Sequence, residues 1–338
     1  MNLVTGATGI LGSHVVLALL QNNQPVVACR QKTSNIMQVE KLFAYYTGDA
    51  KNLFAKIKWV EVDILDIFSI EEALEGITNV YHCAGFVSFI AADRKKLFAI
   101  NEQGTKNVVD ACLNKNIGAL CHVSSVGAIH NLDYTLPLNE GVFWKKSGRE
   151  SDYAVSKYNA EREVWRGVEE GLNAVIVNPG VILSPGFWHQ SSSKLFETNY
   201  KGNKFYTEGV TGYVGAPDVA NTMIELVSKK LFAGRYIIIE GNYTFKHIFS
   251  TIQANFNKPL PSVKAPRWLL NLVRFLSGFT SIFTGRPNGL TKSVINSAFG
   301  TQVYSGEKAA AVLSFKYTPV DEIIAFICRQ YLADKEKT

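Results

Sequence analysis

The sequence predicts an α/β fold, in which a doubly wound parallel sheet carries helices on both faces and a smaller C-terminal portion binds the substrate. Short apolar runs alternate with longer amphipathic runs in the first half of the chain, and a glycine-rich turn follows the first apolar run. This alternation is typical of repeated strand–helix–strand units. With 338 residues and 47% hydrophobic content, the chain can bury a core without disulfides or metal.

Strands are expected at the short apolar runs, and helices where apolar residues recur every three or four positions. The predicted strands are Asn2–Thr5, Pro25–Cys29, Ile57–Val62, Val80–Cys83, Leu120–Val123, Ala174–Val177 and Tyr236–Glu240. The predicted helices are Ile10–Gln21, Glu102–Asn114, Ser151–Val164, Val320–Leu332 and one that starts at Ser69, in Ser69–Leu74, with Ser69 as its N-cap.

The same pattern divides the chain into two parts. Residues 1–180 are predicted to form the cofactor-binding domain, and residues 181–338 mainly the substrate-binding portion. A segment at about 213–240 is expected to return to the first domain. After about residue 180 the loops become longer and richer in Ser, Gly and Asn. This pattern does not identify the substrate.

Composition and charge exclude several classes of protein. Lys+Arg 35 against Asp+Glu 29 leaves a net charge of +6 without a run of basic residues, which disfavours nucleic-acid binding. The five cysteines are scattered, with no CxxC pair. Neither disulfides nor a metal site is therefore expected. The chain starts without a basic leader, and we expect a cytoplasmic protein with reduced, buried thiols.

The six histidines lack HxxxH spacing, which also disfavours a metal site. His82 and His122 lie within apolar runs and are expected to be core residues with satisfied ring nitrogens. His130 and His189 are candidates for substrate binding, because histidine is often used there.

The segment Trp268–Thr284 is strongly apolar and raises the question of a membrane. It contains Asn271, Arg274 and several hydroxyl residues, and it is shorter than the ~20 apolar residues that a span requires. Our main interpretation is a helical cap over the substrate pocket. Peripheral contact with a membrane surface is the alternative.

The turn TGATGILG predicts a dinucleotide site in a Rossmann fold. Gly6 would permit the tight turn, Gly9 would let the backbone approach a pyrophosphate, and Gly12 would let the helix pack closely on the sheet. The free N–H groups at the start of that helix favour phosphate. The other turn residues expected to contact the cofactor are Thr8, Ile10 and Leu11.

The end of the second strand favours NADP over NAD. Folds of this type usually place an acid there to bind the ribose hydroxyls, but the chain reads ACRQK. Arg30 and Lys32 could instead pair with a 2′-phosphate. Asp63, followed by Ile64, is placed after the third strand to bind the adenine amino group. A cap or loop role for Asp63 is the alternative.

A tyrosine, a lysine and a serine pair indicate acid–base chemistry. Tyr153 and Lys157, in YAVSK, lie four residues apart and therefore on one helical face. The Lys157 ammonium would lower the pKa of the Tyr153 phenol toward neutrality. Ser124 and Ser125 end the strand CHVSS at the carboxyl edge of the sheet, where a hydroxyl can polarise a substrate carbonyl. The alternatives are a surface Tyr–Lys pair and serines that satisfy loop backbone.

Together these motifs resemble the extended short-chain dehydrogenase/reductase family. TGATGILG, VDILD, YHCAG, INEQGTKNV, HVSSVGAI, YAVSK and VNPGVILSPG occur in the family's order, most like its dihydroflavonol-reductase and 3β-hydroxysteroid-dehydrogenase-like branch. The resemblance implies that Tyr153 is the acid–base residue, Lys157 its ribose-binding partner and Ser125 the carbonyl-orienting hydroxyl. It also implies cofactor or site contacts from Ala84, Gly85, Asn101, Ser124, Pro179, Gly180 and Val181.

The resemblance implies an NADP(H)-dependent oxidoreductase acting on a carbonyl or secondary alcohol of a small, fairly apolar substrate. The sequence after Ser125 lacks the tyrosine–glycine pair of many sugar-nucleotide epimerases, which disfavours that class. Two alternatives stay open. One is an epimerase or dehydratase that retains its cofactor, and the other is a non-catalytic cofactor sensor. The resemblance further implies a homodimer formed through the helices Glu102–Asn114 and Tyr153–Val164.

Overall fold

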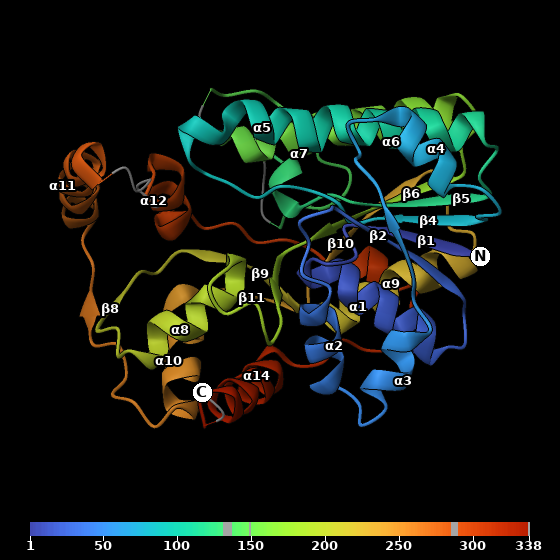
Figure 1. Ribbon diagram of the computed structural model, residues 1–338. Helices are drawn as coiled ribbons and strands as arrows, with labels where there is room; N and C mark the ends of the chain where they lie inside the picture. The colour runs from blue at the N-terminus through green and yellow to red at the C-terminus, as the bar shows by residue number, and fades with distance from the viewer. Residues whose placement is uncertain (131–136, 149, 285–289, 337–338) are drawn as a thin grey trace.

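The computed structural model describes all residues except 131–136, 149, 285–289 and 337–338. Its main sheet has seven parallel strands in the order β10-β6-β5-β4-β1-β2-β3 (Figure 1). The strands are β1 (Asn2–Thr5), β2 (Val26–Arg30), β3 (Lys58–Glu61), β4 (Asn79–His82), β5 (Ala119–Val123), β6 (Ala174–Pro179) and β10 (Gly234–Ile238). The order reverses at β1 and β4, which confirms the predicted doubly wound α/β class.

Helices cover both faces of this sheet because successive strand residues point to opposite sides. Val4 of β1 packs toward the layer of α1 (Ile10–Gln21), α2 (Met37–Ala44), α3 (Ala50–Ala55) and α9 (Ala216–Ser228). Its neighbour Leu3 packs toward α4 (Ile67–Ala73), α6 (Gly104–Asn114) and α7 (Asp152–Glu169). Near α7 lie the short helix α5 (Arg94–Phe98) and a π-helix (Ala99–Gln103) that leads into α6.

The C-terminal portion is a smaller lobe. Its three-stranded sheet consists of β7 (Val181–Leu183), β9 (Val210–Gly215) and β11 (Gly241–Thr244), and β8 (Phe205–Tyr206) pairs with β12 (Val263–Lys264). A separate core cluster joins this lobe's helices α8 (Lys194–Tyr200), α10 (Phe245–Asn255) and α14 (Val320–Glu336). The remaining helices are α11 (Arg267–Thr284), α12 (Lys292–Phe299) and α13 (Glu307–Ala310). α9 and β10 lie between β9 and β11 in the sequence, but they belong to the larger part of the molecule. There β10 is a strand of the main sheet, and α9 covers one of its faces.

Most predicted elements form within one or two residues of the expected bounds, but the start of α4 was wrong. The helix begins at Ile67, and its N-cap is Asp66, whose carboxylate accepts a hydrogen bond from the Phe68 nitrogen at 3.1 Å. Asp66 is as good a cap as Ser69, and it lies one turn earlier. Ser69 instead accepts a bond from the Asp63 nitrogen at 3.2 Å.

The helix predicted in the apolar segment forms as α11, but the cap interpretation is not supported. Trp268 is 67% exposed and Phe275 is 66% exposed, whereas a helix covering a pocket would bury such side chains. Among the described residues, no helix is both long enough and apolar enough to cross a bilayer.

Candidate active site

The glycine turn forms the tight connection from β1 to α1. Gly6 has φ +63°, and a Cβ there would lie 2.6 Å from the Ala84 nitrogen. A Cβ at Gly12 would collide with the Gly6 backbone. Gly9 is the N-cap of α1, and no side chain caps the helix. Ile10 and Leu11 then start α1. The exposed Gly9 backbone and the uncapped helix start fit a phosphate group.

The loop after β2 lies beside this turn. The Thr8 hydroxyl donates to the Ser34 hydroxyl at 3.3 Å, and Ser34 accepts a bond from the Gln31 nitrogen at 3.1 Å. Arg30 is half-buried at the end of β2, and Lys32 is exposed. These cations and hydroxyls form a polar rim next to the phosphate turn. Ser34 was not anticipated, because only the folded loop brings it to Thr8.

In the folded chain an acidic residue lies beside Arg30, although none is close to it in the sequence. Glu61 of β3 is the register partner of Arg30, and their side chains approach to 3.8 Å. The expectation of no acid near this strand end was therefore incomplete, since the adjacent strand supplies one. Both groups contact solvent, so the pair contributes only about 0–1 kcal/mol and leaves Arg30 able to bind an anion.

Asp63 and Ile64 hold the loop that follows β3. The exposed Asp63 carboxylate accepts a hydrogen bond from the Leu65 nitrogen at 2.9 Å, which is the loop role considered as its alternative. Ile64 is buried, and its carbonyl accepts a bond from the Asn107 amide at 3.0 Å. Binding of adenine by Asp63 stays a prediction.

The residues predicted to be catalytic lie just after β5 and on α7. The Ser151 hydroxyl caps α7 by accepting a bond from the Ala154 nitrogen at 3.1 Å, which places Tyr153 in the first turn. Tyr153 and Ser125 meet at Gly127, where an added Cβ would lie 3.9 Å from the Tyr153 ring and 3.4 Å from the Ser125 Oγ. Ser125 also accepts a bond from the Gly127 nitrogen at 3.1 Å. Tyr153 and Ser125, 28 positions apart in the sequence, are therefore brought together.

The direction of the Tyr153 pKa differs from the expectation. Burial raises the pKa of Tyr153, and the Ser125 hydrogen bond offsets this only in part. The Lys157 ammonium donates to the Val123 carbonyl at 2.6 Å. Burial lowers the pKa of Lys157 to about 8, and the charge of Glu161 opposes that effect.

Glu161 is a site residue that the sequence reasoning missed. It lies one turn beyond Lys157 on α7 and is 1% exposed. Its carboxylate accepts a bond from the Asn178 amide and pairs with Arg235 at 3.4 Å. The signal was present in YAVSKYNAE, because a second i, i+4 step from Lys157 continues the same helical face.

Asn101 supports the active-site helix. Its side chain accepts a bond from the Phe86 nitrogen at 2.7 Å and donates to the Phe86 carbonyl at 2.9 Å. It also donates to the Ser156 hydroxyl of α7 at 2.9 Å. A Cβ at Gly85 would lie 3.8 Å from the Lys157 ammonium nitrogen. The loop holding Ala84 and Gly85 thus passes over Lys157.

Two buried histidines lie under this loop, and one departs from the expectation. His82 bonds to the hydroxyls of Thr5 at 2.7 Å and Thr105 at 3.1 Å. The ring of His122 lies 5.2 Å from that of His82, and neither of its nitrogens has a partner among the described residues. Burial lowers the pKa of both rings, and the Lys157 charge lowers it further. His122 is therefore a core residue, but its ring nitrogens lack hydrogen-bond partners among the described residues.

The remaining expected residues fall at strand ends or outside the site. Ser124 is buried, and its nitrogen donates to the Val177 carbonyl at 2.8 Å. Gly180 follows Pro179, the last residue of β6, and Val181 begins β7. His130 packs on Trp144, and the exposed His189 pairs with a glutamate.

The cysteines lie singly among the described residues. All five cysteines are free thiols, and only Cys83 is less than fully buried. In the part of the chain that the structure describes, no three His, Cys, Asp or Glu side chains gather to hold a metal ion.

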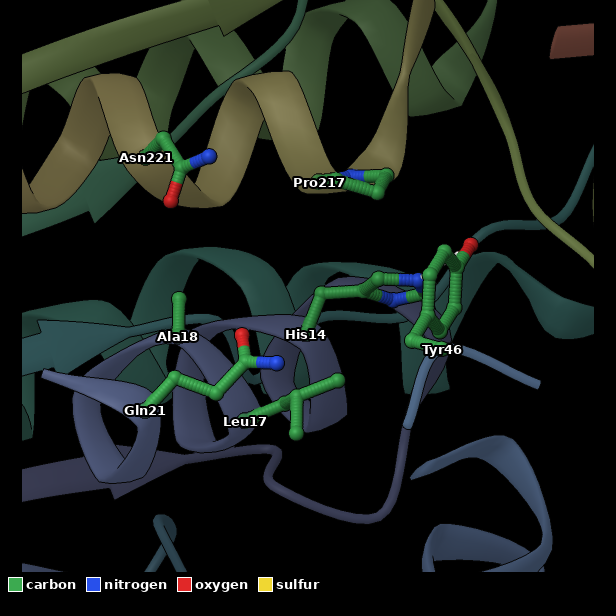
Figure 2. A pocket seen from close by; sticks show the side chains of 7 residues that line it. All are labelled: His14, Leu17, Ala18, Gln21, Tyr46, Pro217 and Asn221. Atoms are coloured by element: carbon green, nitrogen blue, oxygen red, sulfur yellow. Dashed lines mark hydrogen bonds between the residues drawn. The ribbon is translucent and has the colours of Figure 1, made fainter. Parts of the chain in front are cut away.

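A pocket between α1 and α9 lies apart from these residues. Figure 2 shows His14 of α1 facing Pro217 and Asn221 of α9. The His14 ring bonds to the Tyr46 hydroxyl at 3.0 Å, and burial lowers the pKa of His14 to about 4. The α1–α9 layer covers the sheet face opposite α7, so this pocket does not belong to the Tyr153 site.

Comparison with known proteins agrees with the motifs. A model of the NAD dependent epimerase/dehydratase family matches residues 2–204. The chain is 27% identical over 278 residues to sterol demethylase protein B of Methylococcus capsulatus, covering 81% of this chain and 80% of that protein. It is 26% identical over 366 residues to the 3 beta-hydroxysteroid dehydrogenase/Delta 5-->4-isomerase of Monkeypox virus, covering 98% and 99%.

Solved structures show the same architecture. The dTDP-glucose 4,6-dehydratase DesIV of Streptomyces venezuelae, solved with NAD and TYD bound, matches with a TM-score of 0.76 at 17% identity. The match covers 99% of this chain and 98% of that one. At this identity the likeness shows the fold alone.

Proposed function

Because the chain belongs to the NAD dependent epimerase/dehydratase family, within the extended short-chain dehydrogenases, we propose that it uses NADP(H) to interconvert a carbonyl and a secondary alcohol on a small, fairly apolar substrate. It is an NAD(P)-dependent oxidoreductase. The observation that carries the proposal is the convergence of Tyr153 and Ser125 at Gly127, beside the buried Lys157. These are the three groups that carbonyl reduction requires.

The residues present fit a dinucleotide. The uncapped start of α1 and the Gly6–Gly12 turn would hold the pyrophosphate, and Arg30, Lys32 and Thr8 would hold the adenosine end. Lys157, beneath the loop of Ala84 and Gly85, would bind the ribose. The nicotinamide, when bound, supplies or accepts the hydride.

The chain's own groups manage the proton. Ser125 would donate to the substrate carbonyl oxygen and orient it. Tyr153 stays protonated at neutral pH because its pKa is raised, so it can give its proton to the oxygen as the carbon is reduced. Lys157 keeps a positive charge below pH about 8.

The apolar substrate class follows from the site's neighbours. The Phe89 ring lies 5.7 Å from the Tyr153 ring and is partly exposed. Val126 and Gly127 follow Ser125 where many sugar-nucleotide enzymes carry polar residues. An apolar wall with a few hydroxyl groups is typical of sites for small, apolar molecules.

Replacing Tyr153 tests the function. We expect Tyr153→Phe to lower kcat for NADPH-dependent reduction of a cyclic or aromatic ketone by about 100-fold or more, because the proton donor is lost. The NADPH Kd should stay within about twofold. Tyr158→Phe is the matched control on the same helix, since Tyr158 stacks on Trp144 at 4.5 Å. Equal turnover in the two variants, or cofactor retained through purification without net oxidation, would contradict the proposal.

Cofactor choice is tested separately by fluorescence titration. We expect NADPH to bind more tightly than NADH, and Arg30→Ala to weaken NADPH binding about tenfold while leaving NADH unchanged, because a charge-assisted hydrogen bond is lost. Lys58→Ala, an exposed basic residue on β3, is the control. Equal affinity of the wild-type protein for the two cofactors would show that Arg30 binds no 2′-phosphate.

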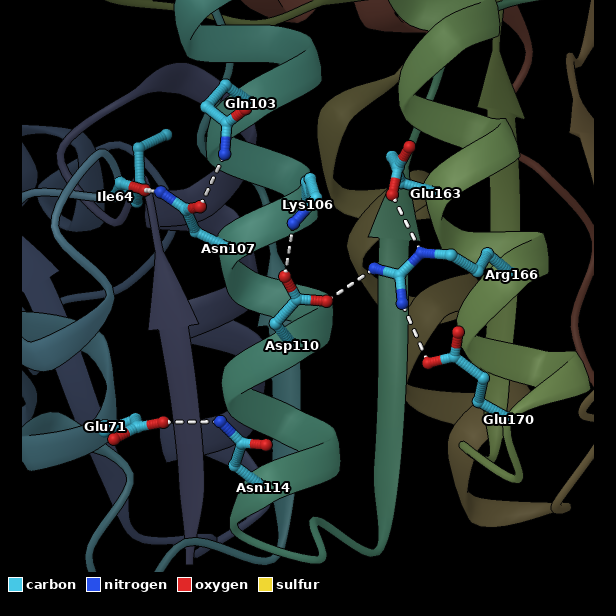
Figure 3. Close-up of polar contacts among 10 residues, drawn as sticks. All are labelled: Ile64, Glu71, Gln103, Lys106, Asn107, Asp110, Asn114, Glu163, Arg166 and Glu170. Carbon is cyan, nitrogen blue, oxygen red and sulfur yellow. Dashed lines mark hydrogen bonds and ion pairs between the residues drawn. The ribbon is translucent and has the colours of Figure 1, made fainter.

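The homodimer through α6 and α7 stays part of the proposal. Figure 3 shows the outer face of these helices, where Asp110 pairs with both Lys106 and Arg166. Arg166 also pairs with Glu163 at 3.0 Å and Glu170 at 2.8 Å. An interface on this face would therefore be polar, and a dimer formed there would weaken as salt is added.

A further inference from the structure

The positive charge of this protein is concentrated in one segment. Residues 241–306 contain no Asp or Glu, and this leaves 28 basic residues against all 29 acidic residues in the rest of the chain. The segment's seven basic residues are Lys246, Lys258, Lys264, Arg267, Arg274, Arg286 and Lys292. The net charge of +6 thus comes from the segment that contains α11, and not from the cofactor-binding half.

The first half of α11 exposes large apolar side chains. Trp268, Leu272 and Phe275 are spaced four and three residues apart, so they lie on one face of the helix. Their exposed fractions are 67%, 45% and 66%. We call these three residues the α11 face. The exposed Arg267 and Arg274 occupy another stripe of the same helix, which makes α11 amphipathic with basic flanks.

Neighbouring residues extend the apolar surface. Leu260 and Val263 are exposed just before α11 in the chain, and Phe205 is exposed on β8, the pairing partner of β12. Lys264 of β12 is also exposed and pairs with the exposed Glu208. Figure 1 shows α11 beside α12 at the end of the molecule opposite the N-terminus. Apolar and cationic groups therefore share one extremity of the protein.

We propose that α11, together with the β8–β12 pair, is a docking surface for a bilayer that contains anionic phospholipid. A helix that lies in the membrane interface has this composition, with tryptophan, leucine and phenylalanine on one side and arginine on the other. The excess positive charge of residues 241–306, which contain no Asp or Glu, is complementary to the negative surface potential of such a bilayer. The helix lies on the surface, consistent with the absence of a spanning helix in the described residues.

A second copy of the chain is a poorer occupant. In a two-fold symmetric contact, each patch meets its own copy. Arg267 and Arg274 would then face cations, and residues 241–306 contain no acid to pair with them. Like charges brought together across an interface oppose association.

Vesicle binding by the full-length protein tests the proposal without any substrate. We expect cosedimentation with vesicles of phosphatidylcholine and phosphatidylglycerol, and at least tenfold weaker partitioning onto phosphatidylcholine alone. Raising ionic strength until the Debye length falls from about 10 Å to about 3 Å should also weaken binding. The triple variant Trp268→Ser, Leu272→Ser, Phe275→Ser should lose at least tenfold in partitioning. Phe68→Ser is the control, since Phe68 is 77% exposed on α4, far from α11.

Three results would overturn the proposal: equal binding to both kinds of vesicle, unchanged binding of the triple variant, or wild-type self-association in sedimentation that the triple variant abolishes. The last would assign the α11 face to a second copy. Far-UV circular dichroism confirms that the variants are folded. Because binding is measured without turnover, failure here leaves the proposed reaction untouched, and failure of that reaction leaves this proposal standing.

Discussion

At the scale of single residues, the charge of Lys157 depends on Glu161. Both side chains are almost fully buried on α7. Burial pulls the Lys157 pKa down to about 8, and the Glu161 carboxylate raises it. Arg235 and Asn178 bond Glu161 in turn, so an ion and its partners are buried together, as burial of charge requires. In the proposed reaction, Glu161 would therefore act through Lys157 as a positioning residue.

Replacing Glu161 should move the alkaline limit of activity. Without its negative charge, the Lys157 pKa falls further below its ordinary value, and the lysine loses its proton at lower pH. We expect Glu161→Gln to shift the alkaline limb of the kcat/KM profile to lower pH by about one unit, a difference of about 1.4 kcal/mol. Glu169→Gln, an exposed position on the same helix, is the control. An unshifted limb in Glu161→Gln would remove Glu161 from the mechanism.

At the scale of elements, the cofactor turn depends on close backbone packing between β1 and α1. Gly12 allows the first turn of α1 to lie against the backbone of Gly6, where any side chain would collide. This contact aims the start of α1 at the edge of the sheet where the ends of β1, β4 and β5 meet. A methyl group added at Gly12 would therefore disturb both the packing of α1 and the phosphate site.

We expect Gly12→Ala to lower the free energy of unfolding by about 1–3 kcal/mol, the usual cost of overpacking, and to weaken NADPH binding. Urea denaturation and fluorescence titration measure the two effects. Gly48→Ala is the matched control, because a Cβ at Gly48 would meet no heavy atom within 4 Å. A Gly12→Ala protein as stable as Gly48→Ala would show that the turn relaxes to admit a side chain.

The strands were easier to predict than several of the helices. Buried parallel strands are short, continuous apolar runs, and their pattern is visible in the sequence. The short helices α2 and α3 span eight and six residues, too few for a clear period. The missed α9 forms because it packs on α1. Pairing of β10 with β6 joins residues about 60 positions apart, which local patterns cannot reveal.

At the scale of the whole molecule, chemistry and charge occupy different places. The Tyr153–Ser125 site lies at the main sheet, whereas the excess positive charge lies in residues 241–306. The cofactor-binding and catalytic residues can therefore be changed without altering the α11 face. This separation is why vesicle binding and turnover report on independent properties of the same chain.

The sequence by itself determined the doubly wound fold and the glycine turn, and it predicts that Ser125, Tyr153 and Lys157 share one site. Each depends on local periodicity or on a motif whose spacing encodes its geometry. Only the tertiary structure decided that Glu61 lies beside Arg30 and that the Tyr153 pKa is raised. The physical reason is that register partners and desolvation come from residues distant in the chain, and no local pattern of side chains records them.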